Sequence, residues 1–331
     1  MRVAVPDHVT PFSGIGVIQN ELYPRLAAKG LDVLPYLSRQ PRSVRSLAHV
    51  SAVLKALATP MPREADALLA LMSPLPLRLP IPTVAMAYDL RWTRTRSALG
   101  RIYRGWDITR TVRSDVVVTI SHRSADDIRE RFPDADPLVI YPGPGQFDSS
   151  GVPEQPSANQ DASRDVLLIG AARHKRNEVA AQVVALLGHD WVGKVRCINV
   201  SSETQSLLTS TLGAGRCEFH VNVSRVELAQ LYGACGISIQ LGVEEGFGLP
   251  YIEALSAGCV VIAVDQPLTR ELLGRAAVLV EEGAPQYIAR QILELAPPSR
   301  EDRVRQAARY SWDSFADGIA GALETAIRSR A

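Results

Sequence analysis

Cysteine is scarce in this chain and does not occur in the spacing of a metal site or a disulfide framework. The four cysteines among 331 residues lie roughly twenty residues apart, without any C-x-x-C pair. This pattern argues against a structural zinc site and against a small disulfide-stabilised domain. We expect each thiol to be a small buried group in a reducing compartment. The four are Cys197, Cys217, Cys235 and Cys259.

Excess charge and long apolar runs are also missing. Lysine and arginine number 36 against 35 acidic residues, so a net charge of +1 gives no overall attraction to nucleic acid. No apolar stretch approaches the roughly 20 residues that span a bilayer. The N-terminal MRVAVPDH is far short of a signal-peptide core. These absences predict a soluble, cytoplasmic protein without a nucleic-acid partner.

The first half of the chain alternates short β-branched runs with helical segments. A length of 331 residues with 46% hydrophobic residues favours two domains. The alternation predicts an α/β protein in which helices cover parallel sheets. In the first half we expect strands over residues 3–5, 32–37, 67–71, 83–87, 115–120 and 138–141.

A polar segment, residues 149–164, divides this half from a second one with the same alternation. It is rich in Ser, Pro, Gln and Asn, as linkers are. We therefore predict a first domain over 1–150, a second over 163–311 and a closing amphipathic helix in 312–331. The second domain has expected strands over residues 166–169, 195–200, 218–221, 236–240, 260–264 and 277–280.

The most informative stretch is EEGFGLPYIEALS, residues 244–256, between two expected strands. Pro250 suits the first turn of a helix, and Gly258 suits the position of positive φ beyond its end. Gly246 and Gly248 then precede a helix N-terminus, where backbone N–H groups and the helix dipole can hold an anion such as a sugar diphosphate.

Two glutamates, Glu245 and Glu253, bracket this glycine loop. Carboxylates are good partners for neighbouring sugar hydroxyls, so one can hold a hexose and the other a ribose. The alternative is that both only decorate a helix start, where acidic residues are favoured.

A cationic group follows the first strand of the second half, in IGAARHKRN, residues 169–177. It lies at the carboxyl end of a strand, where doubly wound sheets bind ligands. Fixed cations there can stabilise a departing nucleoside diphosphate without a metal. Arg173 and either Lys175 or Arg176 would form this clamp, and the sequence does not rank the last two. An exposed basic loop is the alternative.

The stretch EGFGLPYIEALSAG, with Asp265 and Arg270-Glu271 after it, resembles the donor-site signature of glycosyltransferase family four. The resemblance continues through LAQLYGACGISIQ and AAVLVEEGAPQYIARQI and, more weakly, across the first half. It implies the GT-B fold: two Rossmann-like domains facing across a cleft, with the C-terminal helix crossing back. It also implies a retaining, metal-independent hexosyltransferase that uses a nucleoside diphosphate sugar.

The same resemblance implies roles for single residues. Glu253 would hold the ribose hydroxyls and Glu245 the hydroxyls of the transferred sugar. Arg173 and Lys175 would act on the leaving group, with Arg176 in the donor site. The chain departs from the family at Leu241-Gly242, where Pro-Ser is common. The backbone that would contact the sugar and diphosphate is that of Gly246, Phe247, Gly248 and Leu249.

Two segments of the first half resemble the family less closely. The loop SGIGVIQNEL places Gly14 and Gly16 at a turn that would face the donor diphosphate, and Gln19 stands where a dinucleotide site needs glycine. In AMAYDLRW, Tyr88 occupies the family's histidine position. Asp89 would bind acceptor or donor, or cap a helix. This H-D-L-like segment favours mannose or a related sugar as the hexose.

Basic residues gather in the presumed acceptor domain, over residues 39–55 and 91–113, the second run beside Trp92, Tyr103 and Trp106. Such surfaces attract anionic lipid or a lipid-diphosphate acceptor, although solvated helix faces have the same composition. The D-x-D triplet 134–136 falls in a turn away from the expected cleft, and we expect no metal there.

The resemblance implies transfer of a hexose to a glycan or lipid-linked acceptor, in bacterial surface-polysaccharide assembly. One alternative is a nucleotide-sugar epimerase of the same fold, which needs dedicated acid and base carboxylates. Another is a degenerate protein that binds a sugar nucleotide without turning it over.

Overall fold

The computed structural model divides the chain into two compact units. One comprises Met1–Gly143 and Ser311–Ala331, and the other comprises Pro144–Tyr310. Among the residues described, no helix is both long enough and apolar enough to cross a bilayer. The structure describes residues 1–7, 14–37, 61–71, 75, 79–88, 98–144, 163–170, 172–243 and 245–331.

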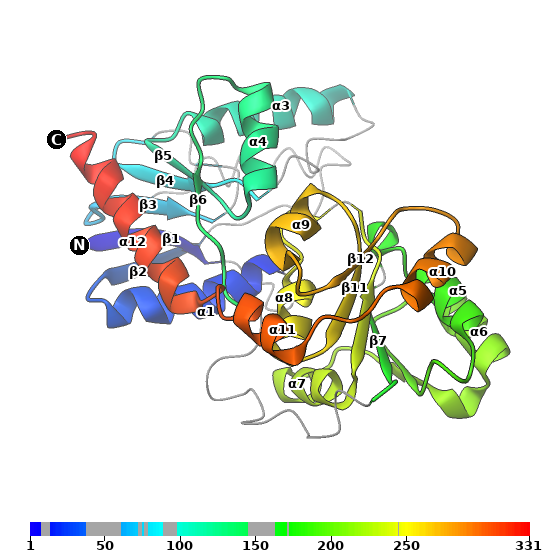
Figure 1. Ribbon diagram of the computed structural model, residues 1–331. Helices are drawn as coiled ribbons and strands as arrows, with labels where there is room; N and C mark the ends of the chain where they lie inside the picture. Colours follow the sequence, from blue (N-terminus) through cyan, green and yellow to red (C-terminus); the bar gives the residue numbers. More distant parts are fainter. Residues whose placement is uncertain are drawn as a thin grey trace. The chain divides into compact units, whose positions relative to one another are not determined.

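Unit 1 contains a parallel sheet of six strands in the order β2-β1-β3-β4-β5-β6 (Figure 1). Its central strands are buried along their whole length, as expected for a parallel sheet with both faces covered. The strands are β1 (Arg2–Asp7), β2 (Asp32–Leu37), β3 (Ala67–Ala70), β4 (Thr83–Met86), β5 (Val116–Thr119) and β6 (Leu138–Val139). The helices are α1 (Gly14–Ala28), α3 (Ala98–Val112), α4 (His122–Arg131) and α12 (Trp312–Arg328).

The last helix, α12, belongs to unit 1 although it ends the chain. It packs against α1 and the strands β3, β4 and β5 (Figure 1). Its residues Phe315, Ile319 and Leu323 are fully buried, as their spacing of four predicts. Gly318 permits the close approach, because an added Cβ would lie 2.6 Å from Ile140 Cγ2.

Unit 2 contains a second parallel sheet of six strands, in the order β12-β11-β10-β7-β8-β9. The strands are β7 (Val166–Ile169), β8 (Val195–Ile198), β9 (Cys217–His220), β10 (Ile237–Gln240), β11 (Val260–Val264) and β12 (Val278–Val280). The helices are α5 (Asn177–Leu187), α6 (Ser202–Leu212), α7 (Arg225–Ala234), α8 (Leu249–Ser256), α9 (Pro267–Leu273), α10 (Pro285–Glu294) and α11 (Arg300–Ala307), with short turns η3 (Arg173–Lys175) and η4 (Ala214–Arg216).

The two sheets confirm the predicted α/β architecture. Each expected strand is present and ends within two residues of its predicted bounds. The expected linker falls almost wholly in 145–162, outside the described residues. The cysteines are free thiols: Cys197, Cys235 and Cys259 are buried as predicted, and Cys217 is partly exposed.

Candidate active site

The glycine loop ends at the start of α8, and its backbone there requires glycine. Gly248 is the N-cap residue, with φ of 75°. A Cβ on Gly248 would lie 2.4 Å from the ring of Tyr251, which is buried one turn into the helix. Pro250 occupies the first turn, as predicted. The loop therefore brings its backbone N–H groups to the positive end of α8.

The other end of α8 is fixed by a Schellman motif. Gly258 has φ of 86°, and its N–H donates to Leu255 O at 2.9 Å, while Cys259 N donates to Ala254 O at 2.8 Å. The buried Arg303 of α11 donates from Nη1 to Gly258 O at 2.6 Å. The predicted positive φ at Gly258 is confirmed, and α8 is held at both ends.

Glu253 points from α8 into the interior of unit 2. Its side chain is 5% exposed, and its Oε2 accepts a hydrogen bond of 2.8 Å from the Tyr232 hydroxyl. Burial raises the pKa of Glu253 to about 7, against the lowering effects of that hydrogen bond and of the Lys175 charge. Its protonation therefore changes near neutral pH.

Glu245 lies in the loop before α8 and pairs with the turn that follows β7. Lys175 Nζ is 2.6 Å from Glu245 Oε1, and His174 Nε2 is 3.5 Å from the same oxygen. The Glu245 side chain is only 9% exposed, so it needs this cation. Glycine at position 242 allows the basic turn to approach closely, since a Cβ there would lie 3.2 Å from His174 O.

The three cations of the basic turn point to different partners. Arg176 has φ of 54°, caps α5 and donates from Nη1 to Glu282 Oε1 at 2.7 Å. Arg173 is exposed and has no ion pair with any residue that the structure describes. Lys175 is the cation that meets Glu245. The geometry thus distinguishes Lys175 from Arg176, which the sequence does not.

Side-chain contacts that the sequence analysis did not predict shape the loop between Gly242 and Gly248. Tyr251 Oη donates to Gly242 O at 3.3 Å, and Gln266 Nε2 donates to the same oxygen at 3.0 Å. Phe247 is buried against Tyr310, with ring centroids 5.8 Å apart. The contacts of Gln266 and Tyr310 have no local sequence signal, because they join residues that are 24 and 63 positions apart along the chain.

The predicted site residues of the first half lie in unit 1. Gly14 and Gly16 open α1, the first exposed and the second buried. Tyr88 follows β4, and its hydroxyl donates to Met86 Sδ at 3.6 Å. Burial raises the Tyr88 pKa well above its usual value. Asp89 lies outside the described residues.

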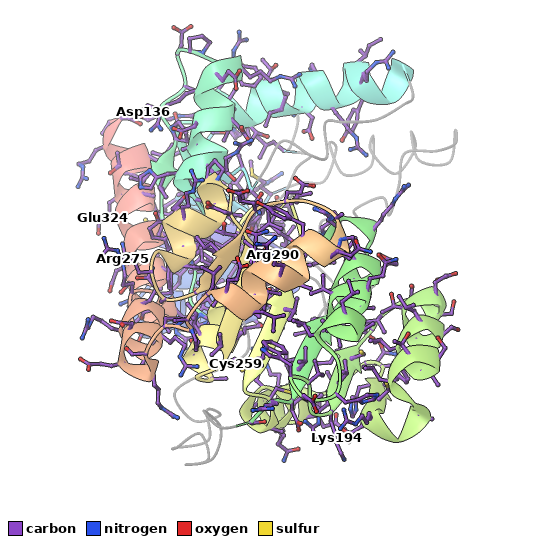
Figure 2. The ribbon with its side chains drawn as sticks, turned by 45° about the vertical axis from the view of Figure 1, so that its right-hand side comes forward. Asp136, Lys194, Cys259, Arg275, Arg290 and Glu324 are labelled. Atoms are coloured by element: carbon purple, nitrogen blue, oxygen red, sulfur yellow. The ribbon has the colours of Figure 1, made fainter. Side chains whose placement is uncertain are left out.

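The D-x-D triplet lies in the turn between α4 and β6, as expected. Asp136 is almost fully exposed on this turn (Figure 2) and accepts a hydrogen bond of 3.2 Å from Arg129 Nη2. In the part of the chain that the structure describes, no group of three or more His, Cys, Asp or Glu side chains is placed to hold a metal ion.

Comparison with known proteins finds one family model that is similar to unit 2. Residues 165–310, which include the glycine loop and the basic turn, match the family model of Glycosyl transferases group 1. No curated protein sequence matches the chain.

Solved structures share the architecture over nearly the whole chain. HepE from Anabaena, solved with UDP and glucose, is 17% identical with a TM-score of 0.70, over 98% of this chain and 99% of that chain. Sucrose-phosphate synthase from Thermosynechococcus elongatus is 15% identical with a TM-score of 0.73, over 97% and 98%. WaaG, a glycosyltransferase involved in lipopolysaccharide biosynthesis, is 13% identical with a TM-score of 0.66, over 97% and 98%. Residues 165–310 are therefore similar to group 1 glycosyl transferases, and the chain has the GT-B fold of two parallel six-stranded sheets with flanking helices.

Proposed function

We propose that this protein is a retaining glycosyltransferase that moves a hexose from a nucleoside diphosphate sugar to an acceptor without a metal. The observation that carries the proposal is the ion pair between Lys175 and Glu245, at 2.6 Å, in the loop before the glycine-capped helix α8, which also bears Glu253. A cation, carboxylates and the positive end of a helix dipole are the groups that can bind the phosphates and the sugar hydroxyls of a sugar diphosphate. All lie within the segment that matches the family model.

In this proposal each group of unit 2 has one task. Glu253 accepts hydrogen bonds from the ribose hydroxyls, and Glu245 accepts them from the transferred hexose. The backbone of Gly246–Leu249 meets the diphosphate at the N-terminus of α8. Lys175, together with the exposed Arg173, neutralises the charge that grows on the leaving diphosphate, which is the task a metal performs elsewhere. Arg176 supports the turn through Glu282.

The transfer itself needs no side-chain nucleophile. The bond between the anomeric carbon and the diphosphate oxygen breaks, and its electron pair stays on the diphosphate. The acceptor hydroxyl oxygen bonds to the anomeric carbon on the same face of the sugar, and its proton passes to a departing phosphate oxygen. Stabilisation of the diphosphate by fixed cations accelerates this step most.

The acceptor belongs with unit 1 in this proposal, near Tyr88 and Asp89. We infer a glycan or lipid-linked acceptor, a hexose such as mannose and a role in surface-polysaccharide assembly at the cytoplasmic face of the membrane. The family resemblance supports these assignments, as does the structural likeness to WaaG, which is involved in lipopolysaccharide biosynthesis.

Thermal unfolding with a panel of UDP-, GDP-, ADP- and dTDP-sugars in EDTA tests the donor proposal. A ligand present at about 100 times its Kd stabilises the folded state by about 2.7 kcal/mol, so one donor class is expected to raise Tm by several degrees. Glu253→Ala should lose most of this shift, and Glu294→Ala, on the exposed side of α10, should keep it. If no sugar nucleotide raises Tm with or without Mg²⁺, the proposal is wrong.

Helix α3 is proposed to contact an anionic membrane. Its Ile102 is 71% exposed and Trp106 is 40% exposed, and the Arg110 guanidinium lies 4.8 Å from the Trp106 ring. The acidic residue of the helix, Asp107, is buried. Exposed apolar groups flanked by cations are the composition of helices that lie in a bilayer interface. The other arginines of the helix and its end are Arg101, Arg104 and Arg113.

Co-sedimentation with phosphatidylglycerol vesicles at low salt tests this surface. We expect Ile102→Ser with Trp106→Ser to lower the bound fraction at least about five-fold, because both the apolar anchor and the cation–π contact are lost. The matched control is Leu293→Ser with Val304→Ser, two exposed apolar residues of unit 2. Equal binding by both double variants, or equal binding to neutral phosphatidylcholine, would contradict the proposal.

A further inference from the structure

We propose that Tyr232 is a positioning residue of the donor site, which holds the Glu253 carboxylate in its binding orientation and in its ionised form. This inference rests on the proposed donor-binding function of Glu253. Tyr232 belongs to α7, which precedes β10 and lies outside both the glycine loop and the basic turn. The site would thus include a residue of a third segment of unit 2.

The hydrogen-bond geometry gives the Tyr232 hydroxyl one main acceptor. It lies 2.8 Å from Glu253 Oε2 and 3.4 Å from Pro250 O, so its single proton goes to the carboxylate. The Tyr232 side chain is fully buried, and no water needs to compete for it. With Oε2 engaged from inside the protein, Oε1 is the oxygen available to a ligand hydroxyl.

The backbone of Tyr232 is also fixed. Cys259, immediately before β11 (Figure 2), donates from Sγ to Tyr232 O at 3.3 Å and to Cys235 O at 3.2 Å. Tyr232 O further accepts from Cys235 N at 3.2 Å, where α7 ends. Because the backbone of Tyr232 is fixed, its hydroxyl cannot follow the Glu253 carboxylate when that side chain rotates. The hydrogen bond therefore favours one rotamer of Glu253.

The charges around Glu253 make this contact electrostatically important. Burial raises the Glu253 pKa to about 7, and the two effects that lower it come from the Tyr232 hydroxyl of α7 and the Lys175 ammonium of the basic turn. Burial raises the Tyr232 pKa well above its usual value, so the phenol remains a donor at every relevant pH. The neighbouring Cys235 and Cys259 thiols also raise the pKa of Tyr232. Arg303 of α11 donates a hydrogen bond to Gly258 O at the far end of α8. Loss of the hydroxyl would therefore leave Glu253 more protonated at neutral pH.

The test is the pH dependence of donor affinity in Tyr232→Phe, with the sugar nucleotide that stabilises the wild-type protein. Wild-type affinity should rise with pH through about 7, as the Glu253 carboxylate ionises. In the variant the midpoint should move up by about one pH unit, because a hydrogen bond to a charged group is lost. The donor affinity of the variant at pH 7 should be several-fold below that of the wild type. The difference between the two affinities should be smaller at pH 9.

The control is Tyr310→Phe, which removes another buried hydroxyl of unit 2, one that donates to Leu272 O at 2.8 Å. It should destabilise the protein to a similar extent and leave the pH midpoint unchanged. A midpoint in Tyr232→Phe equal to that of the wild type would overturn the proposal, since a merely structural role moves stability and not the midpoint.

Thermal unfolding without nucleotide separates this proposal from the proposed function. Ionisation of Glu253 lowers the stability of the folded protein as pH rises, and in Tyr232→Phe this fall should continue to a higher pH than in the wild type, whether or not any sugar nucleotide binds. If Tyr232→Phe does not fold, 3,5-difluorotyrosine placed at position 232 keeps the ring and strengthens the donor. The pH midpoint of donor affinity should then move down, and an unchanged midpoint would again overturn the proposal.

Discussion

Replacing Lys175 with alanine should lower kcat for sugar transfer about 10²- to 10³-fold, the size of effect seen when one preorganised charge-stabilising group is removed. Lys175 Nζ lies 2.6 Å from Glu245 Oε1, and the Lys175 side chain is 22% exposed. Solvent therefore screens the Lys175 charge only weakly. Donor affinity should fall less than kcat, because charge on the diphosphate grows in the transition state. The measurement is release of nucleoside diphosphate at saturating donor.

Arg176→Ala is the matched control for Lys175→Ala. Its side chain has nearly the same exposure, 20%, but is directed to Glu282 at the surface. It should lower kcat less than ten-fold. Lys175→Arg, which keeps the charge on a different head group, should recover part of the loss. A kcat for Lys175→Ala within a factor of three of the Arg176→Ala value would show that the two cations are misassigned.

Strand patterning explains why the fold was predictable from the sequence. Strands such as β7 and β11 are short runs of aliphatic residues bounded by glycine or polar residues, and a parallel sheet buries them on both faces. Helix ends were equally predictable from the sequence where the backbone geometry requires one residue type. Pro250 in the first turn of α8 and Gly258 beyond its end are local requirements, so sequence alone locates them.

The partners within the site were not predictable, because they join segments far apart in the chain. Lys175 and Glu245 are 70 positions apart, and neither motif says which of the neighbouring cations meets the carboxylate. The choice depends on the η3 turn, where Arg176 takes a left-handed conformation and turns its side chain toward Glu282. The contact of Tyr232 with Glu253 was not predictable for the same reason, because the two residues are 21 positions apart. In addition, an aromatic residue on a helix usually indicates packing alone.

Replacing Glu253 with glutamine should make the protein more stable at pH 8 and weaken donor binding about ten-fold or more. The folded-state pKa of about 7 lies above the ordinary value of 4.5, so the folded protein holds a proton that the unfolded chain releases. Wild-type stability is therefore lost as pH rises from about 4.5 through about 7, by about 3 kcal/mol at 1.36 kcal/mol per pH unit. Glutamine does not ionise, and its amide oxygen can still accept from the Tyr232 hydroxyl.

Chemical denaturation of Glu253→Gln and wild type at pH 5 and pH 8 checks this expectation. The two proteins should have similar unfolding free energies at pH 5, and the variant should be the more stable at pH 8. Glu294→Gln, on an exposed carboxylate, should match the wild type at both values. A buried carboxylate that destabilises its own fold at neutral pH needs a compensating role, and ligand binding supplies one. Equal stability at pH 8 would remove that argument, and unchanged donor affinity in the variant would place the ribose elsewhere.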